Sequence, residues 1–363
     1  MPLSPPPLSL PPKPKSLRIA HISDLHVLDL EGVRWHRFLN KRATGVVNLA
    51  GMRRNAHPVQ VADHLADHLA ERLAQADIDH VIVTGDLTNL ALDAEFARAR
   101  KVIERIGPPE RVTLIPGNHD LYTRGSLRHK RFEKWFSDYL CDDADDAQLA
   151  AQRGREHYPF VRKPAEHVRI YGLSSAVPTL PLLAYGHVGR AQLDKLRREI
   201  GREPAEVTVR IVLVHHNIHH RMGMAEHVAS MIDRKAFSAV MHDVGATLVL
   251  HGHTHHPHQG HLPRGEREAE RWARRDAEYD QKLDTALVGA LGDIPVLGCG
   301  SSTWHRDGKE YARFNVVEVG SRAVERVLAY RFSDGPGDGP GQFTEEHDDL
   351  LDKALADANA IHL

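Results

Sequence analysis

The sequence predicts an α/β fold built around a largely parallel sheet with helices on its faces. Two observations lead to this class. Residues 17–115 alternate short apolar runs with amphipathic segments, and several apolar runs follow one another late in the chain. The alternation is typical of βαβ units, whose strands pair in parallel. The late runs predict a second sheet that is more antiparallel.

The first elements follow from the spacing of their apolar residues. Leu17–Ile22 is a short apolar run that polar residues follow at once, which is the pattern of a buried strand. His57–Ala76 carries leucines at every fourth position in its second half, so it predicts an amphipathic helix. This helix leads into a second buried strand at His80–Thr84.

The next helix is marked at both ends. Asp93–Ile106 begins with a side chain that suits an N-cap, and Gly107-Pro108-Pro109 ends it before a strand at Arg111–Ile115. Farther along, apolar runs predict strands at Val168–Leu173, Val207–Val214, Thr247–Leu250, Pro295–Cys299, Ala312–Val319 and Ala323–Phe332. The chain therefore carries enough strands for two sheets.

We expect one large domain at residues 17–333, with shorter segments around it. The flanking segments are a proline-rich tail at 1–16, a Gly/Pro linker at 334–341 and an acidic helical tail at 342–363. Within the domain, a basic and aromatic segment at 33–54 and a charged helical insertion at 262–283 are additions to the core.

Composition excludes several classes of function. The net charge of −2 gives no signal for nucleic acid or for an anionic membrane as partner. No apolar run reaches the length of a transmembrane helix. Cys141 and Cys299 lie far apart in the sequence and fit a reducing compartment. We therefore expect a cytoplasmic protein. Its oligomeric state is not determined by the sequence, and a homodimer is compatible with it.

Polar clusters follow five of the predicted strands. They are Asp24-Leu25-His26, Gly85-Asp86, Gly117-Asn118-His119-Asp120, His215-His216 and Gly252-His253-Thr254-His255. In an α/β sheet the carboxyl ends of the parallel strands share one edge, and ligands bind there. The five stretches should therefore place carboxylate, imidazole and amide groups in one cleft.

The donor atoms of these clusters point to metal chemistry. Oxygen and nitrogen donors without sulfur suit Mn²⁺, Zn²⁺, Fe or Co²⁺. Glycines beside Asp86, Asn118 and His253 allow tight turns at crowded positions. One carboxylate can bridge two cations roughly 3.5–4 Å apart, the spacing of two-metal hydrolases. The pattern predicts a site for two metal ions.

In this order, the motifs resemble those of the calcineurin-like metallophosphoesterase superfamily. All five are present between Asp24 and His255, about two-thirds of the chain. The resemblance implies a four-layer αββα sandwich of two mixed β-sheets flanked by helices, with the dimetal site at the carboxyl ends of the strands. It also implies a metal-dependent phosphoric ester hydrolase acting on a small phosphate ester.

The resemblance assigns a role to each matching residue. One metal would be held by Asp24, His26, His255 and the bridging Asp86, and the other by Asp86, Asn118, His215 and His253. His119 would contact the substrate phosphate and protonate the leaving oxygen, with Asp120 holding its ring. A metal-bridging hydroxide would attack phosphorus in line. The family's ligand directly follows its strand, which favours His215 over His216. His216 would then lie behind the ligands or at the substrate.

Simpler interpretations stay open for the other polar residues. Asx and His residues also cap ordinary loops, but six such coincidences in family order would be required. His219, His220, His256, His258 and His261 fit a polar loop better than a further site. In the segment 33–54, the side chains of Arg37, Lys41 and Arg42 either grip the substrate phosphate or form a solvated basic loop. The insertion at 262–283 is better explained as a surface or oligomer element than as a lid.

The residues that follow Asp86 and His119 indicate which class of phosphate ester the enzyme cleaves. Leu-Thr-Asn follows Asp86, where protein Ser/Thr phosphatases carry Asp-Arg-Gly, and Asp120 stands where they carry Glu. Both forms look more like the bacterial class III cyclic-nucleotide phosphodiesterases. We therefore expect cleavage of a cyclic nucleotide or small diester.

Two alternatives to the phosphodiesterase remain. One is a lipid-headgroup or nucleotide-sugar pyrophosphatase or a phosphomonoesterase, for which Trp35, Phe38 and Leu39 would supply an apolar groove beside the metals. The other is a non-catalytic scaffold that uses the same fold to bind proteins. Such scaffolds typically lose metal ligands, whereas this chain retains them all.

Overall fold

The computed structural model describes residues 16–31, 33, 58–142, 144–180, 183–218, 229–262, 294–304, 312–334 and 341–346. Within these residues the chain forms two six-stranded sheets with helices on their outer faces. The predicted tail at 1–16, linker at 334–341, basic segment at 33–54 and insertion at 262–283 lie almost wholly outside the described residues.

The first sheet has the order β12-β11-β10-β1-β2-β3. Its strands are β1 (Leu17–Ile22), β2 (His80–Val83), β3 (Val112–Leu114), β10 (Arg313–Val319), β11 (Val324–Ser333) and β12 (Gln342–Glu346). The three early strands pair in parallel, and β10, β11 and β12 extend the sheet as an antiparallel meander.

The second sheet has the order β4-β5-β6-β7-β9-β8. Its strands are β4 (Phe160–Ala165), β5 (Val168–Gly172), β6 (Val209–Leu213), β7 (Leu248–His251), β8 (His258–Leu262) and β9 (Ile294–Gly298). The four central strands are parallel, and the edge strands β4 and β8 are antiparallel. Both sheets are therefore mixed.

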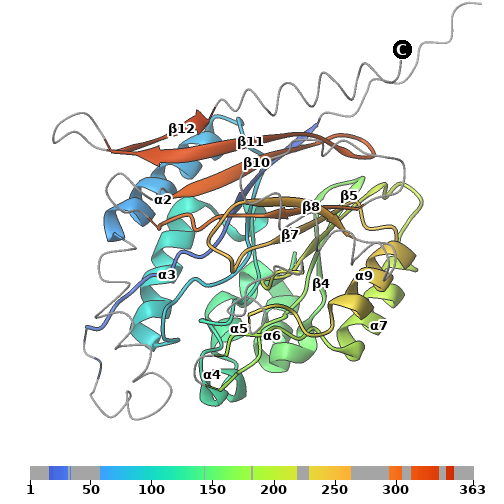
Figure 1. Ribbon diagram of the computed structural model, residues 1–363, viewed down its shortest axis with the longest axis horizontal. Helices are drawn as coiled ribbons and strands as arrows, with labels where there is room; N and C mark the ends of the chain where they lie inside the picture. The colour runs from blue at the N-terminus through green and yellow to red at the C-terminus, as the bar shows by residue number, and fades with distance from the viewer. Residues whose placement is uncertain are drawn as a thin grey trace, which may run out of the picture.

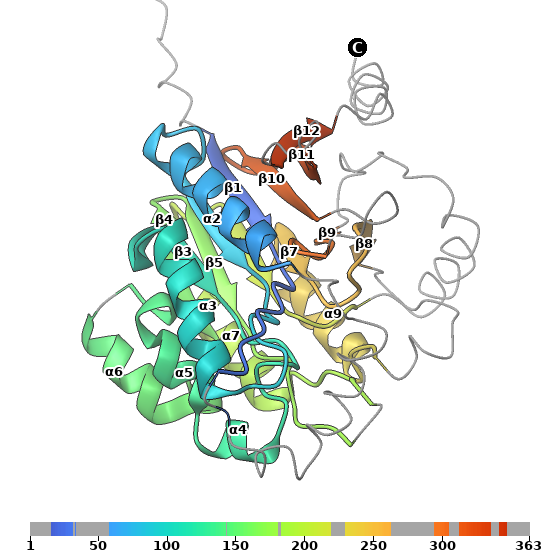
Figure 2. The same ribbon diagram turned by 90° about the vertical axis from the view of Figure 1, so that its left-hand side faces the viewer.

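The helices form the two outer layers. They are α2 (Val59–Ala74), α3 (Asp93–Ile106), α4 (Arg124–Arg128), α5 (Arg131–Phe136), α6 (Ala144–Arg153), α7 (Arg190–Ile200) and α9 (Arg234–Asp243), with short 3₁₀ turns at Pro109–Arg111, Ser137–Leu140 and Gly154–His157. Figure 1 shows α2 and α3 on one side of the sheets and α7 and α9 on the other. The short helices α4, α5 and α6 gather next to α3 (Figure 2).

The alternation of side chains along β6 explains this layering. Ile211 and Leu213 belong to the core that both sheets share, whereas Val212 and Val214 belong to the separate core under α7 and α9. Because successive residues of a strand point to opposite faces, an uninterrupted apolar strand is buried on both sides. The predicted α/β fold with two mixed sheets and flanking helices is confirmed. The prediction that the late strands form a second, more antiparallel sheet was wrong, because β10, β11 and β12 pair onto β1 and extend the first sheet.

The C-terminal prediction was wrong at residues 342–346, which form strand β12 instead of the start of an acidic helix. Phe343 is buried opposite Phe332 of β11. The acidic residues that suggested a helix make cross-strand contacts: Glu346 lies 3.0 Å from Arg313, and the hydroxyl of Tyr330 donates to Glu345 at 3.2 Å. Residues 347–363 of this predicted tail lie outside the described residues. Strands β4 and β8 were also missed.

Among the helices that the structure describes, none combines the length and the apolar character needed to span a membrane.

Acid should destabilise the fold through His80, a buried residue at the start of β2. Its Nε2 lies 2.7 Å from the hydroxyl of Thr113, and burial lowers its pKa to about 3, with the charges of Arg162 and Arg111 adding to the effect. An unfolded histidine has a pKa of about 6.5, so only the unfolded state gains a proton between these values. The free energy of unfolding therefore decreases as the pH falls below about 6.5. At pH 5, His80 alone should account for a decrease of about 2 kcal/mol.

Urea denaturation of the wild type and of His80→Gln at pH 8 and pH 5 measures this effect. The difference in free energy of unfolding between the two pH values should be about 2 kcal/mol smaller in the variant. His129, which is exposed next to α4, provides the matched control as His129→Gln. Equal pH dependence in the wild type and His80→Gln would contradict the prediction.

Candidate metal centre

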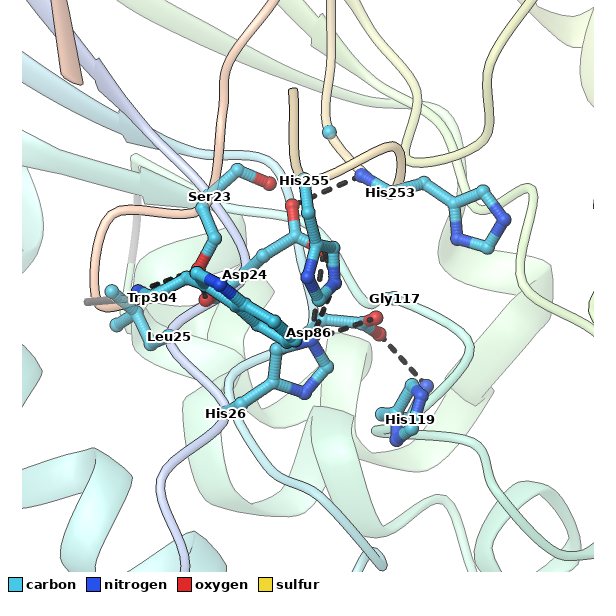
Figure 3. Close-up of polar contacts among 12 residues, drawn as sticks. Ser23, Asp24, Leu25, His26, Asp86, Gly117, His119, His253, His255 and Trp304 are labelled. Atoms are coloured by element: carbon cyan, nitrogen blue, oxygen red, sulfur yellow. Dashed lines mark hydrogen bonds and ion pairs between the residues drawn. The ribbon is translucent and has the colours of Figure 1, made fainter. Parts of the chain in front are cut away.

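The predicted ligands meet at the carboxyl ends of parallel strands from both sheets. The first sheet supplies the turns after β1, β2 and β3, and the second supplies those after β6 and β7. Figure 3 shows the side chains of Asp24, His26 and His255 turned toward one another, with Asp86 beside them. Residues more than 200 positions apart in the sequence therefore share one site.

The first group of donors consists of Asp24, His26 and His255. The two Nε2 atoms of His26 and His255 are 3.0 Å apart, and Asp24 Oδ1 lies 3.8 Å and 3.3 Å from them. This Oδ1 is buried and has no hydrogen-bond donor among the residues that the structure describes. Burying a carboxylate oxygen without a donor is costly unless a cation neutralises it. The group therefore fits a metal ion.

The second group consists of Asp86, His215 and His253, with Asn118 beside it. His215 Nε2 lies 3.3 Å from Asp86 Oδ2 and 3.0 Å from Asn118 Oδ1. The other ring nitrogen, Nδ1, donates to the backbone carbonyl of Thr84 at 2.7 Å. This contact orients the ring and directs the Nε2 lone pair into the site, as is usual for histidine ligands.

Asp86 lies between the two groups. Its Oδ2 is 3.7 Å from His26 Nε2 on one side and 3.3 Å from His215 Nε2 on the other. Its Oδ1 accepts a hydrogen bond from the backbone N–H of His119 at 2.8 Å. A single buried carboxylate thus faces both sets of histidine donors, which is the arrangement that a bridging ligand needs.

The electrostatics of the site favour positive charge. Burial alone would raise the pKa values of Asp24 and Asp86, but His255 beside Asp24 and His215 beside Asp86 outweigh burial and lower both. Burial lowers the pKa of His253 to about 3, with the charge of His215 adding to the effect. Two ionised carboxylates and a neutral His253 are the protonation states that metal coordination requires. Asp86 outweighs burial and raises the pKa of His215 to about 9, so His215 would release a proton when a cation binds.

Five of the predicted ligands have backbones in the left-handed region. The φ angles are 55° at Asp24, 45° at His26, 55° at Asp86, 73° at His253 and 58° at His255. Each such residue costs on the order of 1–3 kcal/mol and persists only where its surroundings enforce it. The concentration of this strain in one place is typical of a functional site.

Glycines make room for these crowded turns, as the sequence predicted. A Cβ atom on Gly117 would lie 2.1 Å from Asp86 Oδ1, and one on Gly252 would lie 1.9 Å from Ser23 Oγ. Gly85 itself has a φ of 98°, which favours glycine. Larger residues at these positions would displace the ligands.

Comparison with known proteins decides the family. The model of the calcineurin-like phosphoesterase family matches residues 17–257, which is more than half of the chain and includes every predicted ligand. The chain belongs to the calcineurin-like phosphoesterase family. Membership implies a metal-dependent hydrolase of phosphate esters, in agreement with the predicted enzyme class.

Solved structures are similar to this chain at low sequence identity. A dimetal phosphatase from Danio rerio is 13% identical with a TM-score of 0.50, over 91% of this chain and 98% of that one. A purple acid phosphatase from yellow lupin seeds is 12% identical with a TM-score of 0.49, over 93% of this chain and 55% of that one. A 5′-nucleotidase precursor from Thermus thermophilus is 15% identical with a TM-score of 0.42, over 96% and 59%. No curated protein sequence matches this chain.

Within this family member, His119 and Asp120 have separate contacts. His119 Nδ1 donates to the backbone carbonyl of Asn89 at 2.7 Å, and its ring lies 4.7 Å from that of His26. Asp120 instead accepts from the backbone N–H groups of Leu87, Thr88 and Gly117, at 3.2, 2.9 and 2.9 Å, and from the Thr88 hydroxyl at 3.0 Å. The prediction that Asp120 holds the ring of His119 was therefore wrong, because both of its oxygens face these donors. Asp120 ties the turn after β2 to the turn after β3.

Replacing Asp120 by asparagine should destabilise the protein by about 2–4 kcal/mol, because an amide NH₂ would face backbone N–H donors and leave them unpaired. Burial and then the charge of Asp86 raise the pKa of Asp120 to about 7, so urea denaturation should be measured at pH 8, where the carboxylate is ionised. Asp243→Asn, at an exposed ion pair with Arg197, should change stability by less than about 1 kcal/mol. Unchanged stability in Asp120→Asn would contradict this role.

His216 is buried beside the predicted ligands His215 and His253. Its side chain is 0% exposed, its Nδ1 lies 2.9 Å from the hydroxyl of Ser175, and its ring packs 4.6 Å from that of His253. His216 as a substrate contact stays a prediction, whereas His215 stands where a ligand is expected. The other predicted substrate contacts, Arg37, Lys41 and Arg42, lie outside the described residues.

Sequence reasoning missed several residues that support the site. The Asn89 side chain donates to the backbone carbonyl of His26, while the backbone carbonyl of Asn89 accepts from His119. Ser175 Oγ accepts from the backbone N–H groups of both His215 and His216 at 3.2 Å. The position of Asn89 three residues after Asp86 was a signal that could have identified it. Nothing in the local sequence marks Ser175.

Proposed function

We propose that this calcineurin-like phosphoesterase hydrolyses a phosphodiester, either a cyclic nucleotide or a small diester, with two metal ions. One ion would be held by Asp24, His26, His255 and Asp86, and the other by Asp86, Asn118, His215 and His253. The observation that carries the proposal is the position of Asp86, whose Oδ2 faces His26 at 3.7 Å and His215 at 3.3 Å. Nitrogen and oxygen donors without sulfur support Mn, Fe, Zn or Co as the metal.

The preference for a diester rests on the motif forms. Leu87-Thr88-Asn89 and Asp120 resemble the class III cyclic-nucleotide phosphodiesterases. Their contacts support treating them as one unit, because Thr88 bonds to Asp120 while Asn89 bonds to His119. Cys141 and Cys299 are buried free thiols, which fits the cytoplasmic location that forms part of the proposal.

Two bound cations would neutralise the phosphoryl oxygens and acidify a water molecule. The chain's own residues would orient the substrate and protonate its leaving oxygen. The hydrogen bond from His119 Nδ1 to Asn89 leaves Nε2 as the atom that would deliver a proton to the leaving oxygen. The backbone N–H of His119 bonds to Asp86 Oδ1, so the proton donor and the bridging carboxylate are held at a fixed separation.

Metal reconstitution tests the proposal. The purified protein is stripped of metal, and Mn²⁺, Fe²⁺, Zn²⁺ or Co²⁺ is added back singly before hydrolysis of bis-p-nitrophenyl phosphate and p-nitrophenyl phosphate is compared. We expect metal-dependent cleavage that favours the diester and disappears in Asp86→Ala. A preference for the monoester would favour the phosphomonoesterase alternative. Bound metal without hydrolysis of any phosphate ester would contradict the enzymatic function.

A further inference from the structure

The segment that follows β9 runs against the turn that carries Asp24 and His26. The backbone N–H of Ser302 donates to the Ser23 carbonyl at 2.9 Å, and the Ser302 hydroxyl accepts from the Ser23 N–H at 3.1 Å. Ser301, Ser302 and Thr303 are all buried. They lie beyond residues 17–257, the part of the chain that the family model matches.

Two hydroxyl groups of this segment satisfy backbone carbonyls next to the ligands. Ser301 Oγ donates to the carbonyl of Asp24 at 2.8 Å, and Thr303 Oγ1 donates to the carbonyl of Leu25 at 2.7 Å. Ser301 Oγ itself accepts from the backbone N–H of Trp304 at 3.1 Å, which fixes the direction of its hydroxyl proton. Without these hydroxyls, two buried carbonyls would lose donors.

The opposite side of the same turn is held by the first sheet. The N–H of Asp24 donates to the carbonyl of Gly85 at 3.0 Å, and the N–H of His26 donates to the carbonyl of Asp86 at 2.9 Å. The N–H groups of the left-handed turn are thus bonded to the residues after β2. On its carbonyl side it is pinned by hydroxyls from more than 270 residues away.

The same segment also contacts a ligand from the other sheet. The Trp304 ring lies edge-on to the ring of His255, with centroids 5.3 Å apart. Residues 301–304 therefore touch the backbone around Asp24 and His26 and the side chain of His255. Asp24, His26 and His255 together make up the first group of donors.

We propose that Ser301 and Thr303 are positioning residues that hold the left-handed turn at Asp24–His26 and thereby set the affinity of the Asp24, His26 and His255 group for its cation. This inference rests on the proposed metal site and goes beyond it, because neither hydroxyl is a ligand. Partners that orient ligands typically change metal affinity by about 10–100-fold when they are removed. The second group, around His215, makes no described contact with these two hydroxyls and should keep its affinity.

Titration of Mn²⁺ into the metal-free protein by calorimetry tests the proposal without reference to activity. In Ser301→Ala and in Thr303→Val, one of the two ions should bind about 10–100-fold more weakly, while the other binds as in the wild type. Thr303→Ser keeps the hydroxyl and should retain wild-type affinity at both sites. This rescue separates a hydrogen-bonding role from a packing role.

Thr113→Val is the matched control. Thr113 is also buried, and its hydroxyl is bonded to His80 at the start of β2, the end away from the metal centre. This variant should lose stability in urea but bind both ions as the wild type does. Circular dichroism of each metal-free variant checks that it is folded, and the two single variants make the test independent of either one folding.

Wild-type affinity for both ions in folded Ser301→Ala and Thr303→Val would overturn the proposal. Equal weakening in Thr303→Ser and Thr303→Val would also overturn it, because the hydroxyl would then not be responsible. Failure of the wild type to bind two ions would overturn both this proposal and the proposed function. Two tightly bound ions without ester hydrolysis would remove the proposed function alone, since the affinities are measured without substrate.

Discussion

Asp86→Asn is expected to lose metal-dependent hydrolysis by about 10⁴-fold or more in kcat/KM, the size seen when one member of a catalytic unit is removed. Asparagine keeps the shape of the side chain but removes the charge, and its NH₂ group cannot bind a cation. Because Asp86 Oδ2 faces both His26 and His215, the change affects both groups of donors. Metal analysis of the purified variant should therefore show a loss of bound metal that parallels the loss of rate.

A matched control lies at the other end of the strand that Asp86 follows. Asp79 directly precedes β2, at the end away from the site, and its carboxylate accepts from the backbone N–H of Arg18. Asp79→Asn should keep both metal ions and near wild-type kcat/KM. Retention of two ions and full activity in Asp86→Asn would show that Asp86 is not a bridging ligand and would remove the main support for the proposed function.

His119→Gln is expected to lower kcat by about 10²–10⁴-fold, the usual contribution of a general acid, while two ions stay bound. Its ring lies 4.7 Å from the ring of His26, and its Nδ1 donates to the backbone carbonyl of Asn89, so Nε2 is the nitrogen that would transfer the proton. The loss should be larger for a diester with an alkyl leaving group than for bis-p-nitrophenyl phosphate. An alkoxide needs a proton to leave, whereas p-nitrophenolate needs it far less.

This dependence on the leaving group separates two roles of His119. Its ring nitrogen lies within reach of His26 and Asp86, so a role as metal ligand is the competing explanation. Loss of one bound ion, with the same decrease for both leaving groups, would support the ligand role and contradict the proton donor. The exposed His129→Gln should change neither the metal content nor the rate.

The sequence predicted the central strands because each is a short, mostly apolar run whose apolar residues are buried on both faces, as Ile211 and Val212 are in β6. It failed for β8 and β12, whose residues have no such run. Gln342–Glu346 carries one buried aromatic residue, and its acidic side chains find partners only after the chain pairs with β11. An edge strand such as β12 forms because of the strand it pairs with, and that pairing is set by the tertiary structure and not by the local sequence.

The ligand positions could be predicted because each directly follows a strand. Parallel strands bring their carboxyl ends to one edge, so Asp24 and Asp86 had to lie near each other once the strands were identified. His253 follows β7 of the other sheet and meets them only because the two sheets pack together. Local sequence could not say which way a side chain turns within its loop. Asp120 adjoins His119, yet its carboxylate faces the backbone N–H groups of Leu87, Thr88 and Gly117.

The sequence by itself thus determined the family, the α/β class and the set of candidate donor atoms, because strand periodicity and the order of motifs are local properties of the chain. Only the tertiary structure decided how those donors are supported. The carbonyl of Asn89 orients His119, and the hydroxyls of Ser301 and Thr303 hold the turn at Asp24. These contacts join backbone groups to residues far away in the sequence, and a backbone carbonyl has no sequence signature because every residue carries one.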